Sequence, residues 1–548
     1  MTRALTALLA TLVASCGGGG NSTPPIVVGS QLNDPSCHYQ YTLPGTVVPI
    51  MGADPLFGQL WHLQNTGQDG GVAGEDIRAL AAWSVTKGGG VRIAVLDDGV
   101  ELFHEDLSAN LVAGASYDYR PARRDGIYGI YPLPCAKDDD HGTQVTGILA
   151  ARDTNATGVA GVAPRAGFVA YNVLANTTVS NIANALTRDG QNNAVYNSSW
   201  SSPDDVADGG GGVLHRVDNS FALAISDGIA NGRGGKGSIY MFPAGNGRCF
   251  AYSQGICQND NSNFDGYLTQ RGVNAICAVD NRGQSPWWAE SGANVLVCAP
   301  SSGDRAEPLG YISTTAVGNT YANNFSGTSA STPMASGVAA LMVAANPNLS
   351  WRDVRIVLAK SARKNDATDP GWTTNFGLNH HPRYAFGVIN AQAAVALARG
   401  WTSVGTSATL ASCTPLGASG RVVNINLPDA PAVGNPIART SVATVSSANC
   451  PGVTTIEQVE VDFEATHAYS GDLRVELVSP GGLVSVLANE RICDGAGDAC
   501  GAYSPAWTFT SLRHLEEPSG GNWTLRVTDA QTGDTGQWLR WNLRFWGR

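Results

Sequence analysis

Three short segments of this chain carry residues whose types and order suit nucleophilic catalysis. Asp97 lies in the run Asp-Asp-Gly, His141 in His-Gly-Thr, and Ser329 in Gly-Thr-Ser-Ala. A serine hydroxyl is a weak nucleophile, so it needs a histidine to accept its proton and a carboxylate to hold the imidazole in one tautomer. The sequence therefore predicts Asp97, His141 and Ser329 as a catalytic triad.

Each member of the predicted triad adjoins a regular element that would hold it. Residues 91–96 form an apolar run typical of a buried strand that ends at Asp97, and an apolar periodic stretch follows His141. Residues 329–343 are predicted to form a helix of small residues, with Pro333 in its first turn. The N–H groups and the dipole at the start of that helix would favour negative charge on a tetrahedral intermediate.

A fourth segment offers a donor for the oxyanion. Residues 240–247 read as a strand, a glycine turn and then Asn246, whose side-chain amide would act together with the backbone N–H of Ser329. Taken alone, each of these motifs is a common turn or loop sequence. Their joint order, with each motif after a strand or before a helix, favours the catalytic interpretation.

The segments resemble the subtilase superfamily of serine proteases over roughly residues 54–398, and within it the kexin and furin branch of proprotein convertases. Asp98 stands where generic subtilases have serine, and the runs at 199–205, 263–267 and 286–290 are similar to three convertase segments. The resemblance implies an α/β fold, with a parallel sheet flanked by helices. It also implies an endopeptidase that cleaves after arginine or lysine, with dibasic sites favoured.

The resemblance assigns four residues to substrate recognition. Asp98 would face the penultimate basic residue, while Asp204 and Asp265 would line the primary specificity pocket beside Trp200. Two carboxylates in a narrow pocket would repel each other unless a cation lay between them, and a substrate arginine or lysine is that cation. The alternative is that Asp204 and Asp265 lie in solvated turns, because each adjoins glycine or proline.

Calcium is the cofactor that the resemblance implies, at two sites. The first would take carboxylates from Asp54 and Asp106 and the side chain of Asn155. The backbone carbonyls of Asp153, Thr157 and Val159, in the same loop as Asn155, would complete it. The second, beneath the specificity pocket, would join Asp204, Asp260 and Glu290. Asp106 has an alternative interpretation as an ordinary helix cap.

Composition limits the classes of partner. The chain has 548 residues, a net charge of −11, only 14% charged residues and 66 glycines. This balance argues against nucleic-acid binding and suits attraction of basic peptide segments. After the N-terminus, no apolar run reaches the ~18 residues that a membrane helix needs. Membrane contact is therefore expected only through a lipid anchor.

Residues 1–16 read as a secretory signal that ends in a run resembling a bacterial lipobox. Cys16 would then carry the lipid, and residues 17–53 would form a linker or N-terminal extension. Gly17 favours an outer-membrane destination in a bacterial cell; the alternative is a simple signal peptide and a secreted protein. Because residues 17–53 are too few for the folded prodomain typical of the family, we expect a separate folding chaperone.

Ten cysteines remain after Cys16, an even number that an oxidising compartment can pair completely. Short spacings favour two pairs, a longer spacing favours a third, and elimination leaves two more. The pairs are, in that order, Cys249–Cys257 and Cys493–Cys500, then Cys413–Cys450, then Cys277–Cys298 and Cys37–Cys135.

Residues 405–548 read as a second domain. Alternating strand patterns at 459–463, 473–477, 523–527 and 541–545 predict a β sandwich of jelly-roll type. The runs Tyr-Ser-Gly-Asp-Leu, Leu-Val-Ser-Pro-Gly-Gly and Asn-Trp-Thr-Leu-Arg-Val, which begin at residues 469, 477 and 522, resemble the convertase P domain. In that family the P domain packs on the catalytic domain and stabilises it. We expect His467 and His514 to be structural.

The sequence thus predicts a calcium-dependent serine endopeptidase, secreted or anchored at the cell surface, that acts on proteins or peptides with basic residues. Two other functions stay open. A broad-specificity degradative subtilase would keep the triad without the acidic pocket. A surface lipoprotein with an inactive triad would instead bind partners through its P domain.

Overall fold

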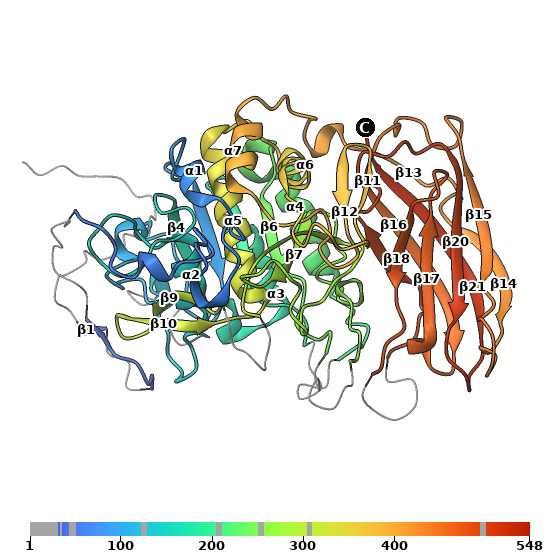
Figure 1. The fold of residues 1–548 in the computed structure, drawn as a ribbon, viewed down its shortest axis with the longest axis horizontal. Helices are drawn as coiled ribbons and strands as arrows, with labels where there is room; N and C mark the ends of the chain where they lie inside the picture. The colour runs from blue at the N-terminus through green and yellow to red at the C-terminus, as the bar shows by residue number, and fades with distance from the viewer. Residues whose placement is uncertain are drawn as a thin grey trace, which may run out of the picture.

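The structure is a computed structural model, and it describes the chain in eight segments: residues 31–32, 36–42, 51–121, 129–203, 211–249, 257–303, 310–493 and 500–548. The predicted signal sequence with Cys16 and the predicted pocket residue Asp204 lie outside these segments. An α/β body and a β sandwich lie side by side along the longest axis of the molecule, and the chain ends where the two meet (Figure 1).

The α/β body is built on a six-stranded parallel sheet. Its strand order is β4 (Gly167–Tyr171), β3 (Arg92–Leu96), β5 (Asn193–Ser198), β6 (Ile239–Pro243), β7 (Val273–Val279) and β8 (Val295–Pro300). The strands are buried along almost their whole length, as expected for a parallel sheet covered on both faces. Because the carboxyl ends of parallel strands meet at one edge, residues that follow β3, β5 and β6 come together there.

Seven α helices occur in the described segments. They are α1 (Ala79–Trp83), α2 (His141–Ala150), α3 (Val179–Thr187), α4 (Asn219–Asn231), α5 (Thr328–Ala345), α6 (Trp351–Ser361) and α7 (Ala391–Arg399). The helix α5 is rich in alanine, serine and glycine, so it lies close against β5, β6, β7 and β8 in the middle of the body (Figure 1). None of the helices in the described part of the chain is long and apolar enough to cross a membrane.

Short antiparallel pairs complete the body. They are β1 (Gln31–Leu32) with β2 (Tyr41–Thr42), β9 (Ile312–Ala316) with β10 (Thr320–Phe325), and β11 (Thr373–Asn375) with β12 (Leu378–His380). The second pair leads directly into α5. That helix begins one residue earlier and ends two residues later than predicted, so Pro333 lies in its second turn and the prediction of a first-turn proline is wrong.

The sandwich consists of two antiparallel sheets. One has the order β13 (Ala411–Cys413), β21 (Gly536–Gly547), β16 (Ile456–His467) and β19 (Trp507–Ser511), and β14 (Arg421–Leu427) also pairs with β21. The other has the order β15 (Arg439–Val445), β20 (Gly521–Asp529), β17 (Leu473–Val478) and β18 (Val484–Ala488). The four predicted alternating strands lie inside β16, β17, β20 and β21, which confirms the all-β prediction for this region.

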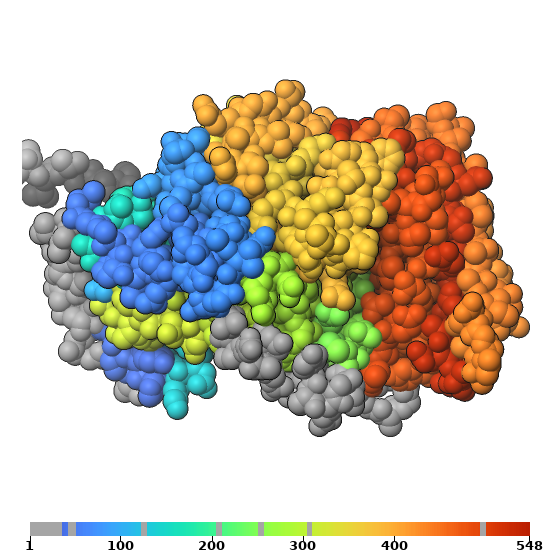
Figure 2. All heavy atoms as spheres, viewed as in Figure 1, coloured from blue at the N-terminus to red at the C-terminus, as the bar shows by residue number. Residues whose placement is uncertain are grey.

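The sandwich and the α/β body share a buried interface, and their outer surfaces abut in the view of Figure 2. Leu214 and Phe264 of the body belong to the apolar core of the sandwich. On the same interface, the fully buried Arg352 of α6 forms a bidentate ion pair with Glu457 of β16. Breaking such a pair would leave a buried charge uncompensated, so the two parts are docked firmly.

The described residues contain five disulfide bonds, and each joins two cysteines that were predicted to pair. They are Cys37–Cys135, Cys249–Cys257, Cys277–Cys298, Cys413–Cys450 and Cys493–Cys500. The pairing predicted from spacing and elimination is therefore confirmed.

Candidate active site

Asp97 and His141 form a hydrogen-bonded pair at the edge of the sheet. Asp97 follows β3 and is 1% exposed, and His141 is the first residue of α2. His141 Nδ1 lies 2.8 Å from Asp97 Oδ1, and the imidazole packs edge-on against the ring of Phe325. Burial opposes a charged imidazole, but the Asp97 carboxylate outweighs it and raises the pKa of His141. The arrangement holds the imidazole in one orientation and favours its protonated form.

Ser329 lies at the start of α5, four residues after Phe325. Its hydroxyl donates to the carbonyl of Ser199 at 3.0 Å, and no hydrogen bond joins it to His141 among the described residues. The Ser199 hydroxyl in turn donates to the carbonyl of Ser329 at 3.1 Å. That carbonyl is available because Pro333, four residues on, has no N–H to donate to it. The second-turn proline thus permits the contact between Ser199 and Ser329.

Asn246 lies beside the N-terminus of α5. It follows β6 and Gly245, which adopts a φ of +110°. Asn246 Oδ1 accepts hydrogen bonds from the backbone N–H and the hydroxyl of Thr328, at 2.9 and 3.0 Å. Because the carbonyl side of the amide faces Thr328, the N–H bonds of Nδ2 point away from that residue. A Cβ at Gly327 would lie 3.6 Å from the Ser329 backbone N and 3.8 Å from Asn246 Nδ2, so the two nitrogens flank the same position.

Asp98 holds the start of α2. Its carboxylate accepts from the backbone N–H groups of His141 and Gly142, at 3.1 and 2.8 Å. Burial and the neighbouring Asp97 raise the pKa of Asp98 to about 8. The residue predicted to face a penultimate basic side chain thus also has a structural contact, which orients the helix that carries His141.

Three buried carboxylates line a small cavity next to this edge of the sheet: those of Asp260, Asp265 and Glu290. Asp265 is 9% exposed and accepts from the backbone N–H groups of Ser202 and Tyr267, at 2.9 and 2.7 Å. Burial raises the pKa of Asp265, so a cationic partner would stabilise its charged form. The cavity is suited to a positively charged group.

Trp200 lies at the end of β5, where its indole N–H donates to the carbonyl of Leu96 at 2.9 Å. Its ring packs edge-on against Tyr267 and Phe242, at 5.7 and 5.5 Å between centroids. It does not line the cavity that holds Asp265. The structure therefore places Trp200 as a support for Tyr267, two residues beyond Asp265.

The first predicted calcium site has oxygen donors in place. Asp54 accepts from the backbone of residues 154 and 155, and Asp106 lies 2.7 Å from the amide of Asn155. Burial, with the nearby Asp54, raises the pKa of Asp106 to about 7. Hard oxygen donors whose charge burial disfavours fit a cation such as Ca²⁺. No group of three or more His, Cys, Asp or Glu that could hold a metal occurs in the described segments.

The predicted ligands differ in how well they fit calcium. Asp153 pairs with Lys87 and Arg165, and its carbonyl accepts from Arg165, which does not fit a calcium ligand. Thr157 and Val159 lie in the same loop, where the Val159 N–H donates to Asp106. At the second site, the carboxylate of Glu290 lies against Gly245, so closely that a Cβ there would be 2.3 Å from Glu290 Oε1. Glu290 and Asp260 face one cavity, whereas Asp204 lies outside the described segments.

Two site features were missed by sequence reasoning. Ser199 was part of a motif used for recognition, yet its reciprocal contact with Ser329 was not anticipated. His215 lines the acidic cavity and its main chain bridges to that of Asp265. The proline four residues after Ser329 could have indicated the first feature, because it frees a carbonyl. No local signal indicated the second.

Comparison with known proteins agrees with this geometry. Residues 88–378 match the model of the subtilase family, and residues 456–545 match the proprotein convertase P-domain. The chain is 30% identical to Protease KEX1 of Kluyveromyces lactis and 31% identical to the dibasic-processing endoprotease of Schizosaccharomyces pombe, in each case over 90% of its own length. It spans only 60% and 65% of the length of these two relatives.

A solved structure with a similar fold is the serine protease of Aeromonas sobria, known alone and in a complex with a chaperone. It superposes with a TM-score of 0.74 at 24% identity and covers 91% of this chain and 96% of its own. At that identity the likeness concerns the fold, which is the α/β body followed by the antiparallel sandwich. The match over residues 88–378, taken with the paired Asp97 and His141 beside Ser329, shows that the chain belongs to the subtilase family.

Proposed function

We propose that this chain is a calcium-dependent serine endopeptidase that hydrolyses peptide bonds after basic residues, with dibasic sites favoured. The observation that carries the catalytic part is the 2.8 Å contact between Asp97 and His141 at the edge of the sheet where α5 presents Ser329. The proposed limits of the catalytic and P domains are residues 54–398 and 405–548.

In the proposed reaction, Ser329 Oγ attacks the carbonyl carbon of the scissile bond. Its proton passes to His141 Nε2, while Asp97 stabilises the imidazolium through Nδ1. The hydroxyl must first leave the carbonyl of Ser199, and it turns toward His141 when substrate fills the site. The negative charge on the tetrahedral oxygen is stabilised by Asn246 Nδ2 and by the backbone N–H of Ser329. His141 then gives its proton to the leaving amine, and water releases the acyl group.

Basic specificity is assigned to the acidic cavity. A guanidinium or ammonium group there would lie among carboxylates, and burial disfavours the ionisation of Asp265 in its absence. Asp204 completes the proposed set with Asp265, and Asp98 serves the penultimate basic residue. The family of dibasic-processing relatives supports this choice of substrate over broad specificity.

Calcium is proposed as a structural cofactor. Asp54, Asp106, Asn155, Thr157 and Val159 would hold one ion, and Asp260 and Glu290 with Asp204 would hold the other. When bound, the ion would neutralise buried carboxylates and fix the loops that carry them. No step of hydrolysis passes through the metal.

We further propose that the protein is exported from a bacterial cell and either anchored at the outer membrane through Cys16 or released. The lipobox-like run before Cys16 supports this. A dedicated folding chaperone is proposed as a partner, by analogy with the complex known for the Aeromonas sobria protease. Efficient refolding of the purified chain alone would rule out that need.

The proposed specificity is tested with two peptides that differ only in the residue before the scissile bond, arginine in one and leucine in the other. We expect kcat/KM to be much higher for the arginine peptide, and activity to fall after removal of calcium with a chelator and to return when calcium is added. Equal cleavage of the two peptides would favour a broad-specificity subtilase. An intact chain that cleaves neither would favour the inactive lipoprotein.

A further inference from the structure

One side of the acidic cavity is formed by a segment that lies between the cavity and the sandwich. Residues 211–216 begin with a turn at residues 211 and 212, and His215 then forms a β-bridge with Asp265. Val213 and His215 line the cavity that holds Asp265. The residues that contact the sandwich are Gly212, Leu214 and Arg216.

Gly212, Leu214 and Arg216 each form a hydrogen bond with the sandwich. The guanidinium of Arg491 donates to the carbonyl of Gly212, and the N–H of Leu214 donates to the carbonyl of Cys500 at 3.0 Å. Arg216 donates to the carbonyls of residues 502, 505 and 506, at 3.3, 2.6 and 3.1 Å. One side of the cavity is therefore held in place by Arg491, Cys500 and residues 502–506.

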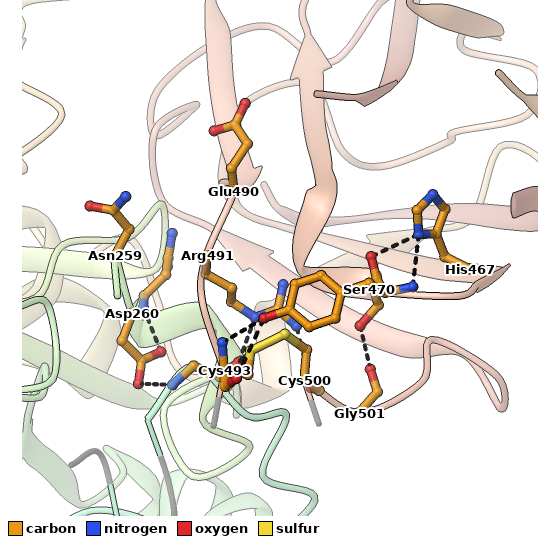
Figure 3. Close-up of a disulfide and its surroundings, with 12 residues drawn as sticks. Asn259, Asp260, His467, Ser470, Glu490, Arg491, Cys493, Cys500 and Gly501 are labelled. Carbon is orange, nitrogen blue, oxygen red and sulfur yellow. Dashed lines mark hydrogen bonds between the residues drawn. A yellow bond between two sulfur atoms is a disulfide. The ribbon is translucent and has the colours of Figure 1, made fainter. Parts of the chain in front are cut away.

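Arg491 is the central residue of this contact (Figure 3). It is 3% exposed, and its guanidinium lies 3.9 Å from the ring centroid of Phe264. It also donates to the hydroxyl of Tyr503 and to the carbonyl of Cys500, at 3.1 and 3.3 Å. Among the described residues no ion pair is recorded for Arg491, although burying an unpaired charge is costly. Its donors instead fix three oxygen atoms at the interface.

Gly212 connects Arg491 to the acidic cavity. Its carbonyl accepts from Arg491, and its N–H donates to Asp260 Oδ2 at 2.8 Å. Gly212 has a φ of +71°, and a Cβ there would lie 2.8 Å from the carbonyl oxygen of Ile492 and 2.9 Å from Cys493 Sγ. The position needs glycine for both reasons. A displacement of Arg491 would thus move the peptide group that holds Asp260.

The loop that carries Arg491 is held by the Tyr-Ser-Gly-Asp-Leu motif at residues 469–473. This motif has no role in the reaction proposed above. Three of its residues contact that loop. The N–H of Cys493 donates to the hydroxyl of Tyr469 at 2.8 Å, the N–H of Arg491 donates to the carbonyl of Gly471 at 2.9 Å, and the Ser470 hydroxyl donates to the carbonyl of Gly501 at 2.8 Å. The disulfide Cys493–Cys500 links the segment that ends at Cys493, which carries Arg491, to the segment that begins at Cys500, which carries Gly501 (Figure 3).

We propose that Arg491 is a positioning residue for substrate recognition: through Gly212 it sets the side of the acidic cavity on which Asp260 lies, so that the P-domain-like sandwich determines the preference for arginine. The inference rests on the proposed function of that cavity. It assigns the Tyr-Ser-Gly-Asp-Leu motif and the disulfide Cys493–Cys500 to the same task.

The test compares the ratio of kcat/KM for the arginine and leucine peptides, together with the dissociation constant of benzamidine, a small mimic of the arginine side chain. Arg491→Met should lower the ratio and weaken benzamidine binding about tenfold each, while labelling by a fluorophosphonate stays complete. Arg491→Lys keeps a donor toward Gly212 and should recover part of both. Tyr503→Phe removes one hydroxyl that orients Arg491 and should shift both values in the same direction by a smaller factor.

The control is the double change Arg352→Met with Glu457→Gln, which removes a different buried arginine contact at the interface without touching residues 211–216. We expect a lower melting temperature and an unchanged ratio. The inference is overturned if Arg491→Met keeps the wild-type ratio, or if the control lowers the ratio equally. If Arg491→Met does not fold, Tyr503→Phe replaces it in the test, and a wild-type ratio of kcat/KM in that variant overturns the inference. A wild-type chain without arginine preference would instead overturn the proposed function.

Discussion

The triad region and the acidic cavity differ in where their supports come from. Asp97 and His141 are held by elements of the α/β body, with Asp97 at the end of β3 and His141 at the start of α2. The cavity has one side fixed by Arg491, which is 279 residues away from Gly212 in the chain. On the proposed function, chemistry depends on local junctions of strand and helix, whereas specificity depends on the docking of a second domain.

The two regions also use buried carboxylates in opposite ways. Asp97 has its cation within the protein, because it stabilises the protonated form of His141. Burial raises the pKa of Asp265, which faces the cavity that we propose for a basic side chain of the substrate. A carboxylate of the first kind serves every substrate, while one of the second kind selects among substrates. Substitutions in the two regions should therefore separate rate from preference.

The largest expected effect is that of Ser329→Ala. Loss of the nucleophile should lower kcat by about 10⁶ for arginine and leucine peptides alike. The hydroxyl contributes little packing, so the melting temperature should stay close to that of the wild-type chain. Activity of the purified variant above trace level would contradict the assignment of Ser329.

Asp265→Asn should reduce the preference for arginine over leucine peptides and leave the triad unchanged. The change keeps an acceptor for only one of the Ser202 and Tyr267 N–H groups, which bind different carboxylate oxygens, and it removes the charge, which should cost arginine cleavage about 2 to 5 kcal/mol. Cleavage after leucine serves as the internal control and should change little. A variant that prefers arginine as strongly as the wild-type chain would refute the acidic pocket.

Asn246→Ala should lower the rate for both peptides. Removal of one oxyanion donor costs about 2.7 to 4 kcal/mol in the barrier, and it should appear in kcat with little change in KM. Asn246 is exposed, so folding should not be affected. An unchanged kcat would mean that the Asn246 amide points elsewhere during the reaction.

The smallest effect is expected from Asp98→Asn, and it depends on pH. Recognition of a penultimate lysine needs the charged carboxylate, and the pKa of Asp98 is raised to about 8. The preference for Lys-Arg over Ala-Arg peptides, measured as a ratio of kcat/KM, should therefore rise as pH increases through 8 and decline below it. In Asp98→Asn the ratio should be low and constant with pH. A wild-type ratio that falls with rising pH would contradict this role.

Sequence reasoning succeeded where function is encoded locally. The buried run at 91–96 and the small-residue helix after Gly327 placed Asp97 and Ser329 correctly on their elements. Cysteine spacing predicted three of the disulfides and elimination predicted the other two. The prediction of Pro333 in the first turn was wrong, because Pro333 lies in the second turn of a helix that begins at Thr328, only one residue before the predicted start. Residues 211–216 gave no signal, since their conformation is fixed by the distant loop of Arg491.

The most direct test of the central claim is active-site labelling with a fluorophosphonate, followed by mass spectrometry of the modified peptide. The account predicts stoichiometric modification at Ser329 of the wild-type chain, loss of labelling in Ser329→Ala, and complete labelling in Asp265→Asn, whose defect lies in preference alone. A folded wild-type chain that does not react, or that reacts at another residue, would contradict the claim that this subtilase is a working serine endopeptidase.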